Sequence, residues 1–249
     1  MIARPMRAPS EPYAQGKVTL LRLISQSVKE GTEKLPSEEE LAKLAGVSRV
    51  VIRDVLSELE SRGYLTRWRG RGTLINVPVC AAQPRVDEEF SFQELFAARG
   101  MSPAVRLLED RWLPPGEVEL PAGAEIGRGE ERLLMLERVF LGDGVPMIHS
   151  RVYFRGSNLG FDYQSWKNFA ELTLNEFLEL FCIRQPVVTL AEQTVETADA
   201  GLAAKLEVAE GTPLLRMDDV RYGVGSLELL RGTACFCKEI LPLRLVRRR

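Results

Sequence analysis

The chain has few of the residues that build metal sites and catalytic dyads. A single histidine, His149, is present among 249 residues, and the four cysteines, Cys80, Cys182, Cys235 and Cys237, contain no Cys-x-x-Cys spacing. A zinc site of the usual Cys/His type is therefore not expected, and scattered thiols of this kind are typical of a reducing compartment. We predict no metal, no cofactor and a structural role for His149.

Long apolar stretches are also missing. No run approaches the roughly 20 residues that a membrane-spanning helix needs, and residues 1–12 lack the apolar core of a signal peptide. The sequence therefore predicts a cytoplasmic protein with no membrane partner. With 249 residues, of which 45% are hydrophobic and 27% charged, the chain is long enough for two globular domains.

The net charge of −2 conceals an uneven distribution. Residues 1–79 hold 13 Lys and Arg against 9 Asp and Glu, whereas the rest of the chain holds 20 against 26. Because nucleic acids attract positive charge, only the N-terminal part is expected to meet a polyanion.

Two short helices with a tight turn between them follow an amphipathic helix at 18–28. Ser37 precedes a helix in which Glu40 completes a capping box, and Ser48 caps a second helix that runs to about residue 62. Gly46 permits the turn that separates them. This order predicts a helix-turn-helix, whose second helix presents its N-terminal turns to the DNA major groove.

Two arginines lie in those N-terminal turns. Arg49 and Arg53 are four residues apart, so they share a helix face, opposite the apolar stripe. Guanidinium groups there can bind phosphates or guanine edges, whereas the alternative for Arg53 is a pair with a surface carboxylate. We expect both arginines to bind DNA.

A glycine-rich hairpin follows the second helix. Residues 64–68 and 73–77 alternate as strands do, and the connection between them is Arg69-Gly70-Arg71-Gly72. Glycines let a backbone approach a surface closely, and arginines at a hairpin tip suit a minor groove or a phosphate clamp; a solvated turn is the alternative. The hairpin is predicted to be the wing of a winged helix-turn-helix.

These segments resemble the DNA-binding domain of the GntR family of bacterial regulators. The similarity rests on Leu-Pro-Ser-Glu-x-Glu-Leu-Ala at 35–42, Val-Ser-Arg at 47–49, Val-Ile-Arg-x-Val-Leu at 51–56, Leu-Glu-x-x-Gly at 59–63 and Arg-Gly-Arg-Gly-Thr at 69–73. It implies that Arg49 and Arg53 contact DNA and that Gly72 approaches the minor groove. Val51 stands where the family usually has threonine, which removes one hydroxyl. The predicted DNA-binding set is Ser37, Ser48, Arg49, Val51, Arg53, Arg69, Gly70, Arg71 and Gly72.

The C-terminal part predicts an α+β domain. Residues 78–89 lack periodicity and read as a linker between a first domain at 13–77 and a second at 90–245. Strand hairpins interleaved with helices indicate an antiparallel sheet with helices packed on it. Strands are expected at 104–113, 132–141, 145–154, 187–197, 214–222 and 226–240, and helices near 90–100, 166–181 and 199–206.

This order resembles the UTRA ligand-sensing domain of the HutC subfamily of GntR regulators, which is similar in fold to chorismate lyase. The similarity rests on Leu-Glu-Arg at 136–138, Gly-Asp-Gly-Val-Pro at 142–146 and Leu-x-Val-x-x-Gly-Thr-Pro-Leu-Leu at 206–215. It implies a pocket for a small effector, often a phosphosugar or a carboxylic acid.

The resemblance assigns the effector to six positions. Phe140 replaces a second pocket arginine two residues after Arg138, and a two-residue step keeps both side chains on one sheet face, so the pocket wall loses a cation. Ser150 stands where a glutamate is expected. An apolar or aromatic effector is therefore the hypothesis. The predicted effector-binding set is Arg138, Phe140, Ser150, Arg151, Tyr153 and Glu228.

The sequence contains no nucleophile motif, no phosphate loop and no Ser/His/Asp set with a spare histidine. We therefore predict no catalytic residues and a ligand-responsive transcription regulator, a repressor that binds a palindromic double-stranded operator as a homodimer. One alternative is a chorismate-lyase-like enzyme fused to a DNA-binding module. Another is a purely architectural DNA-binding protein, which would not need a second domain of about 150 residues.

Overall fold

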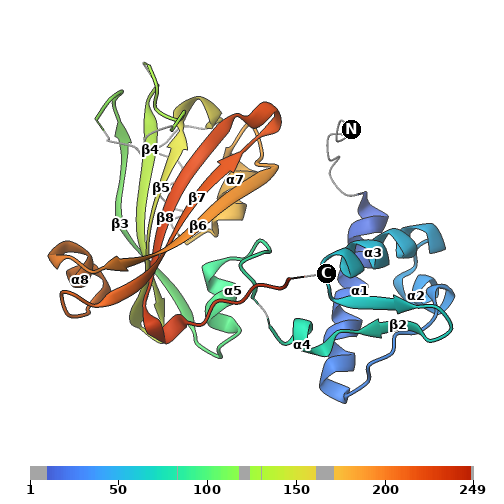
Figure 1. The fold of residues 1–249 in the computed structure, drawn as a ribbon. Helices are drawn as coiled ribbons and strands as arrows, with labels where there is room; N and C mark the ends of the chain where they lie inside the picture. The colour runs from blue at the N-terminus through green and yellow to red at the C-terminus, as the bar shows by residue number, and fades with distance from the viewer. Residues whose placement is uncertain (1–9, 83, 118–123, 130, 161–170, 248–249) are drawn as a thin grey trace. The chain divides into compact units, whose positions relative to one another are not determined.

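The computed structural model describes residues 10–82, 84–117, 124–129, 131–160 and 171–247 (Figure 1). The chain divides into two compact units, one of Met1–Glu89 with Arg244–Arg249 and one of Phe90–Leu243. Each unit has its own hydrophobic core, as a separate domain does.

The first unit is built on three helices, α1 (Glu11–Glu30), α2 (Glu38–Ala45) and α3 (Arg49–Ser61). Gly46 ends α2 in the left-handed conformation, with φ +65°, which lets the chain turn directly into α3. Apolar side chains from all three helices and the following hairpin meet in one core; its largest fully buried members are Leu20, Leu41, Ile52, Leu56, Leu59 and Leu65. The helix-turn-helix predicted from the sequence is present.

A short hairpin packs beside α3. Strands β1 (Leu65–Trp68) and β2 (Gly72–Ile75) pair antiparallel. The chain before α2 adds to the outer edge of β2, because Leu35 N donates to Thr73 O at 3.0 Å and Ile75 N donates to Glu33 O at 2.7 Å. The second strand ends earlier than predicted, since the chain turns at Asn76 into the short helix α4 (Val77–Cys80).

Part of the segment that reads as a linker is fixed to the first unit. Arg85 is 2% exposed, donates to the carbonyl oxygen of Arg62 at 2.8 Å and lies over the ring of Tyr64. Its guanidinium also pairs with Asp87, whose carboxylate accepts from Val246 N at 3.1 Å. The C-terminal residues therefore return to this unit and pair with it, which the sequence pattern does not indicate.

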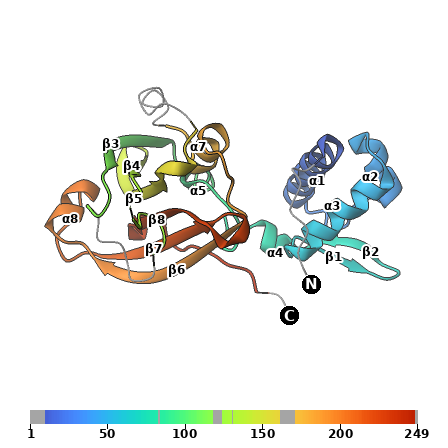
Figure 2. The same cartoon turned by 90° about the horizontal axis from the view of Figure 1, so that it is seen from above.

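The second unit is a six-stranded antiparallel sheet in the order β3-β4-β5-β8-β7-β6. Three helices accompany it within the described residues, and in Figure 2 α5 and α7 lie together while α8 lies at the other end of the unit. The strands are β3 (Pro103–Leu113), β4 (Leu133–Gly142), β5 (Val145–Arg155), β6 (Val188–Thr197), β7 (Pro213–Tyr222) and β8 (Glu228–Phe236), and the helices are α5 (Phe92–Ala97), α7 (Leu174–Phe181) and α8 (Ala200–Leu206).

The predicted α+β class is confirmed, with two differences in detail. The helix expected from residue 166 is described only from Leu174, because residues 161–170 lie outside the described part of the chain. The last strand ends at Phe236, since the chain continues into a 3₁₀ turn, Lys238–Ile240, where a strand was expected. Further 3₁₀ turns occupy Gly156–Asn158 and Val224–Ser226.

The two faces of this sheet are covered differently. On one, which we call the α5/α7 face, one apolar cluster packs against α5 and a second against α7. Helix α8 covers part of the other, the α8 face, where Leu206 packs with Leu214 and Cys235. Because side chains alternate along a strand, neighbouring residues of one strand belong to different faces.

Candidate functional site

The first turns of α2 and α3 are fixed by their capping serines. The Ser37 hydroxyl accepts from Glu40 N at 3.3 Å, and the Glu40 carboxylate accepts from Ser37 N at 2.8 Å. The Ser48 hydroxyl likewise accepts from Val51 N at 3.3 Å. The structure thus places both predicted serines at the helix ends, where they hold the orientation of the turns that follow.

Arg49 and Arg53 project from the first turns of α3. Their side chains are each 60% exposed. A carboxylate of α2 lies between them: Glu38 Oε2 is 3.1 Å from Arg53 NH2 and 3.9 Å from Arg49 NH2. The surface pair considered for Arg53 is therefore present, yet it leaves both guanidinium groups open to solvent. Glu38 was not singled out by the sequence.

Val51 faces the protein interior. Its side chain is partly buried against the core of the first unit, and a methyl group of Val51 lies 3.5 Å from where a Cβ on Gly16 of α1 would stand. The residue next to it, Val50, is 67% exposed. The apolar side chain at this position packs α3 against α1, and a role of Val51 in DNA binding stays a prediction.

The wing carries a basic tip. Gly70 and Gly72 have φ values of +83° and +92°, which favour glycine. Arg69 and Arg71 flank Gly70 on the exposed surface, and the guanidinium of Arg71 lies 4.7 Å from the centroid of the Trp68 ring. The four predicted wing residues therefore lie together at one tip.

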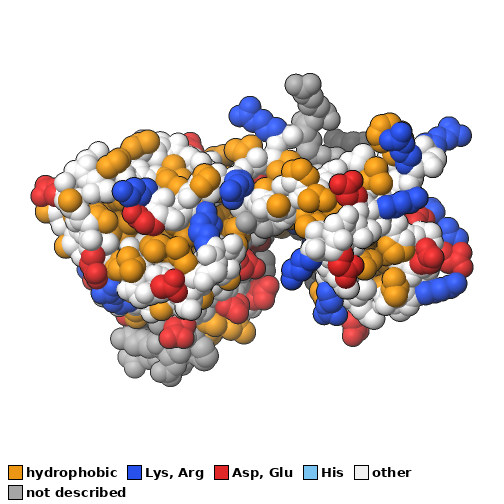
Figure 3. Space-filling view, turned by 90° about the horizontal axis from the view of Figure 1, so that it is seen from below, with side chains coloured by type: hydrophobic (Ala, Val, Ile, Leu, Met, Phe, Trp, Pro, Cys, Tyr) orange, Lys and Arg blue, Asp and Glu red, His pale blue; other side chains and the backbone are white. Residues whose placement is uncertain are grey.

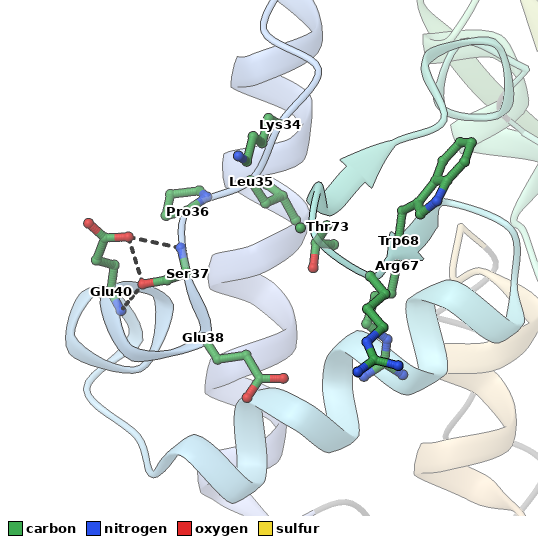
Figure 4. Close-up of a pocket in the computed structure, with 11 residues that line it drawn as sticks. Lys34, Leu35, Pro36, Ser37, Glu38, Glu40, Arg67, Trp68 and Thr73 are labelled. Atoms are coloured by element: carbon green, nitrogen blue, oxygen red, sulfur yellow. Dashed lines mark hydrogen bonds between the residues drawn. The ribbon is translucent and has the colours of Figure 1, made fainter.

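A hollow of about 630 Å³ separates the wing from the start of α2 (Figure 4). Lys34, Glu38 and Trp68 line it, together with Arg67, whose guanidinium is bound by Glu60. Lys34 and Trp68 were absent from the predicted set. The sequence signal for Trp68 was its position between two arginines. No such signal marked Lys34, which lies beside the wing only because its segment pairs with β2.

In the second unit, Arg138 lies buried on the α5/α7 face. Its cross-strand partner is Ser150, and its guanidinium lies 5.0 Å from the centroid of the Phe140 ring. Arg138 NH1 donates to Leu172 O at 2.7 Å. Burial lowers the pKa of Arg138 to about 10. Three of the six predicted effector residues are thus brought together.

Two further charged residues on this face were missed. Asp219 and Arg221 follow each other at a two-residue step on β7, and Arg221 donates to the side chain of Asn175 on α7 at 3.2 Å. Burial raises the pKa of Asp219, whose buried Oδ1 has no hydrogen-bond partner among the residues the structure describes. Period-two alternation along this strand would have placed both on one face.

Glycine and alanine leave space at the centre of the same face. Gly232 is the cross-strand neighbour of Asp219, and Ala234 is that of Ser150. A polar band, comprising Arg138, Ser150 and Asp219, therefore runs between the apolar clusters under α5 and α7.

Arg151 and Tyr153 lie on the α8 face. They point away from Arg138 and Ser150 because they occupy the alternate positions of β5. The six predicted residues therefore do not line one cavity. Both residues line a separate hollow of about 800 Å³ on the α8 face, together with His149 and Lys205.

Three residues that line that hollow belong to one ion-pair cluster. Glu137, 4% exposed, accepts hydrogen bonds from His149 at 2.6 Å, Arg151 at 2.8 Å and Lys205 at 2.7 Å. Burial opposes ionisation of Glu137, but these hydrogen bonds outweigh it and lower its pKa to about 2. Burial lowers the pKa of His149 despite its contact with Glu137. Arg151 and its neighbour Lys205 are thus already paired with the carboxylate of Glu137.

The carboxylate of Glu228 is hydrogen-bonded within the second unit. The residue is 1% exposed, and its carboxylate accepts from Glu125 N at 2.8 Å and from Arg231 at 2.9 Å. These contacts tie the segment around Glu125 to the start of β8. Both carboxylate oxygens of Glu228 are therefore engaged within the second unit.

Neither a metal site nor a membrane span is found in the described ranges. No group of three or more His, Cys, Asp or Glu side chains there could hold a metal ion. No described helix has the length and apolar character to cross a membrane.

Known proteins resemble both units of the chain. The model of bacterial regulatory proteins of the gntR family matches residues 13–75, and the UTRA domain model matches residues 98–226. The HTH-type transcriptional repressor NagR of Bacillus subtilis (strain 168) is 28% identical over 202 residues, which cover 80% of this chain and 77% of that protein. A probable fructoselysine utilization operon transcriptional repressor of Escherichia coli (strain K12) is 40% identical over 63 residues, 25% of this chain and 26% of that repressor.

Solved structures show the same fold. The possible transcriptional regulator YydK from Bacillus subtilis superposes with a TM-score of 0.68 at 17% identity, covering 95% of this chain and 99% of that one. PhnF from Mycobacterium smegmatis gives a TM-score of 0.53 at 21% identity, covering 93% and 98%. The chain belongs to the UTRA domain family, whose model covers more than half of it, and joins that domain to a gntR-family DNA-binding domain at residues 13–75, as a DNA-binding transcription regulator.

Proposed function

We propose that the protein is a repressor of the HutC subfamily that binds a palindromic operator as a homodimer and changes its DNA affinity when a small molecule binds the UTRA domain. Such an operator lies in the bacterial cytoplasm, where the protein would act. The observation that carries the proposal is the pair of exposed guanidinium groups, Arg49 and Arg53, on the first turns of a capped second helix. The names of two relatives, both transcriptional repressors, support the sign of regulation.

DNA recognition would use two elements of the first unit. The N-terminal turns of α3 enter the major groove, where Arg49 and Arg53 exchange Glu38 for phosphates or guanine edges. The tip Arg69-Gly70-Arg71-Gly72 enters the adjacent minor groove, since its glycines let the backbone come close. Ser37 and Ser48 orient these turns through their caps.

The effector would bind on the α5/α7 face, in the polar band between the two apolar clusters. Arg138 offers hydrogen-bond donors there, Ser150 a hydroxyl, and Asp219 a buried oxygen without a partner among described residues. Buried polar groups of this kind are costly unless a ligand or water satisfies them. The ligand proposed is small, accepts from Arg138, donates to Asp219, and lays an apolar part against Phe140.

The dimer would form through β6, an edge strand of the sheet. Among the described strands β6 pairs only with β7, and it exposes Val188, Leu190 and Val195 by 58%, 55% and 77%. Figure 3 shows hydrophobic side chains at the surface of this unit among charged ones. Long apolar edge strands invite pairing, and a second copy of β6 would cover this one.

The enzyme alternative has one arrangement in its favour, which the chemistry weakens. Cys235 is the cross-strand neighbour of His149, which in turn contacts Glu137. However, burial raises the pKa of the Cys235 thiol to about 11, so it is protonated and a poor nucleophile at neutral pH. A binding domain without catalysis is therefore the proposed role of the second unit.

The test of DNA reading is direct. Duplexes enriched by in vitro selection with the wild-type protein would be titrated with wild type, Arg49→Ala and Arg53→Ala by fluorescence anisotropy. Each variant should lose about tenfold or more in operator affinity, because a bidentate contact is worth about 1–3 kcal/mol. Unchanged binding by both variants would contradict the proposal.

The effector site is tested by variants on opposite sheet faces. Metabolite libraries of sugar phosphates and carboxylic acids would be screened by thermal shift, and each hit assayed for its effect on operator binding. Arg138→Gln and Asp219→Asn should abolish the response to a hit while leaving DNA affinity intact. Tyr153→Phe, on the α8 face, should respond as wild type does; loss only in this variant would move the site to the α8 face.

A further inference from the structure

The outer face of the wing carries a cation and an aromatic ring on either side of a glycine. Lys34 pairs with Leu74, and Trp68 pairs with Gly72. Because paired residues, and residues two apart on a strand, share a sheet face, Lys34, Gly72 and Trp68 lie on the same face. We call these three residues the outer wing face.

Only a glycine fits between the other two members. A Cβ on Gly72 would stand 3.1 Å from Cε of Lys34, and the backbone there has φ +92°. The lysine stem thus passes directly over the backbone of β2. The Lys34 ammonium therefore lies beside the start of β2, with Nζ 3.9 Å from that Cβ position.

Trp68 is 55% exposed, and the guanidinium of Arg71 lies over its ring. An aromatic ring stacked with an arginine is a preorganised pair, because the cation–π contact limits the freedom of both side chains. The ring offers its exposed part beside the basic tip.

The opposite face of the wing is occupied by the protein itself. Arg67 extends there, away from Trp68 (Figure 4), and its guanidinium donates to Glu60 at 2.7 Å and to Ser57 at 2.7 Å. The cationic side chains of the wing that remain accessible to a partner are thus Lys34 on the outer wing face and Arg69 and Arg71 at the tip.

We propose that the outer wing face binds the sugar–phosphate backbone along one wall of the DNA minor groove, with Lys34 on a phosphate and Trp68 against the neighbouring deoxyribose. The inference rests on the proposed insertion of the wing tip. The minor groove of B-DNA is about 6 Å wide, so a hairpin whose tip enters it has a backbone on each side. Such contacts add affinity for any sequence and carry no base information.

The ionic half is tested by the salt dependence of binding. Lys34→Gln should lower the slope of log K against log salt concentration by about 0.9, the value for one phosphate contact on B-DNA. The loss should be equal for a selected operator duplex and for a duplex of random sequence. Arg22→Gln, which removes an exposed charge from the middle of α1, is the matched control and should keep the wild-type slope.

The apolar half is tested on the same full-length protein. Trp68→Ala should weaken binding to both duplexes about tenfold, or about 1.4 kcal/mol, with no change in the slope of log K against log salt concentration. Leu44→Ala, which shortens another exposed apolar side chain of the first unit, should bind as wild type does. A change in tryptophan fluorescence on DNA binding should be present in wild type and absent in Trp68→Phe.

The outcomes separate this inference from the function on which it rests. The DNA-reading proposal is refuted if wild type binds no selected duplex, or if Arg49→Ala and Arg53→Ala bind as tightly as wild type does. The outer wing face is refuted if wild type binds normally while Lys34→Gln keeps the full slope and Trp68→Ala keeps the full affinity. A Trp68→Ala loss that disappears at high salt also refutes direct packing.

Discussion

Glu38 should weaken DNA binding, although it lies within the proposed DNA-reading surface. Its carboxylate is 27% exposed and lies 3.1 Å from Arg53 and 3.9 Å from Arg49, the two side chains proposed to meet the duplex. DNA must displace this carboxylate before it can take both guanidinium groups. Replacement of Glu38 by glutamine therefore removes a competitor as well as a negative charge that faces phosphate.

The size of the effect follows from exposure. A solvent-exposed ion pair contributes about 0.2–1 kcal/mol, so releasing Arg53 from Glu38 costs about 0.5 kcal/mol. A carboxylate about 8 Å from a phosphate in water adds about 0.5 kcal/mol of repulsion. The sum of about 1 kcal/mol corresponds to roughly fivefold tighter binding in Glu38→Gln.

Anisotropy titrations with a selected operator and with random duplex would measure the effect. Glu39→Gln is the matched control, because it removes the same charge from the same helix turn, but Glu39 pairs with Lys43 at 3.1 Å and not with α3. Both variants lose a similar interaction with the N-terminal helix dipole, about 0.3–1 kcal/mol, so their stabilities stay comparable. Weaker operator binding by Glu38→Gln, with Glu39→Gln unchanged, would show that the carboxylate positions the arginines in the complex and would refute the competition argument.

Three stability predictions follow from the packing and charges. Gly16→Ala should raise the unfolding free energy of the first unit by about 0.4–1 kcal/mol in calorimetry, because a Cβ would meet methyl groups at 3.5–3.6 Å, those of Val47, Val51 and Val55; a lower melting temperature would show that α1 and α3 are too close. Gly156→Ala should destabilise the second unit by about 1–3 kcal/mol, since its Cβ would lie 2.4 Å from Arg132 O, and an unchanged melt would contradict this. The pKa of Glu137 is lowered from 4.5 to about 2, so the stability it contributes is complete above pH 4.5 and lost as pH falls towards 2. Glu137→Gln should therefore cost about 3 kcal/mol at pH 7 and flatten acid unfolding between those values; a wild-type acid profile in the variant would argue against it.

The helix-turn-helix could be predicted because its signals are local. Ser37, Gly46 and Ser48 each fix a helix end through contacts within a few residues, and the structure has those ends where the sequence puts them. Val51 shows the limit of such reasoning. A family pattern places it on the DNA side, but its neighbour across the core, Gly16, is 35 positions away and only the fold brings the two together.

The effector side of the second unit was harder to predict, because membership of one sheet face depends on register. Arg138 and Phe140 were correctly given one face by the two-residue step, whereas Arg151, the residue after Ser150 on β5, lies on the opposite face. Asp219 lies on a different strand, and its place beside Gly232 follows from the order of β5, β8 and β7. Strand order depends on the pairing of segments that are distant in sequence, so it cannot be inferred from alternation within a single strand.

Charge counting shows the same limit in the first unit. Its surplus of basic residues predicts a polyanion partner but does not say where it binds. Lys17 and Arg62 pair with Glu58, and Arg67 pairs with Glu60, so these cations hold the fold together. Cations without a carboxylate partner within the described ranges include three around the wing, Lys34, Arg69 and Arg71. The pattern of pairing, and not the net charge, therefore singles out the wing as part of the proposed DNA surface, whereas Arg49 and Arg53 at the start of α3 share Glu38 and are not singled out in this way.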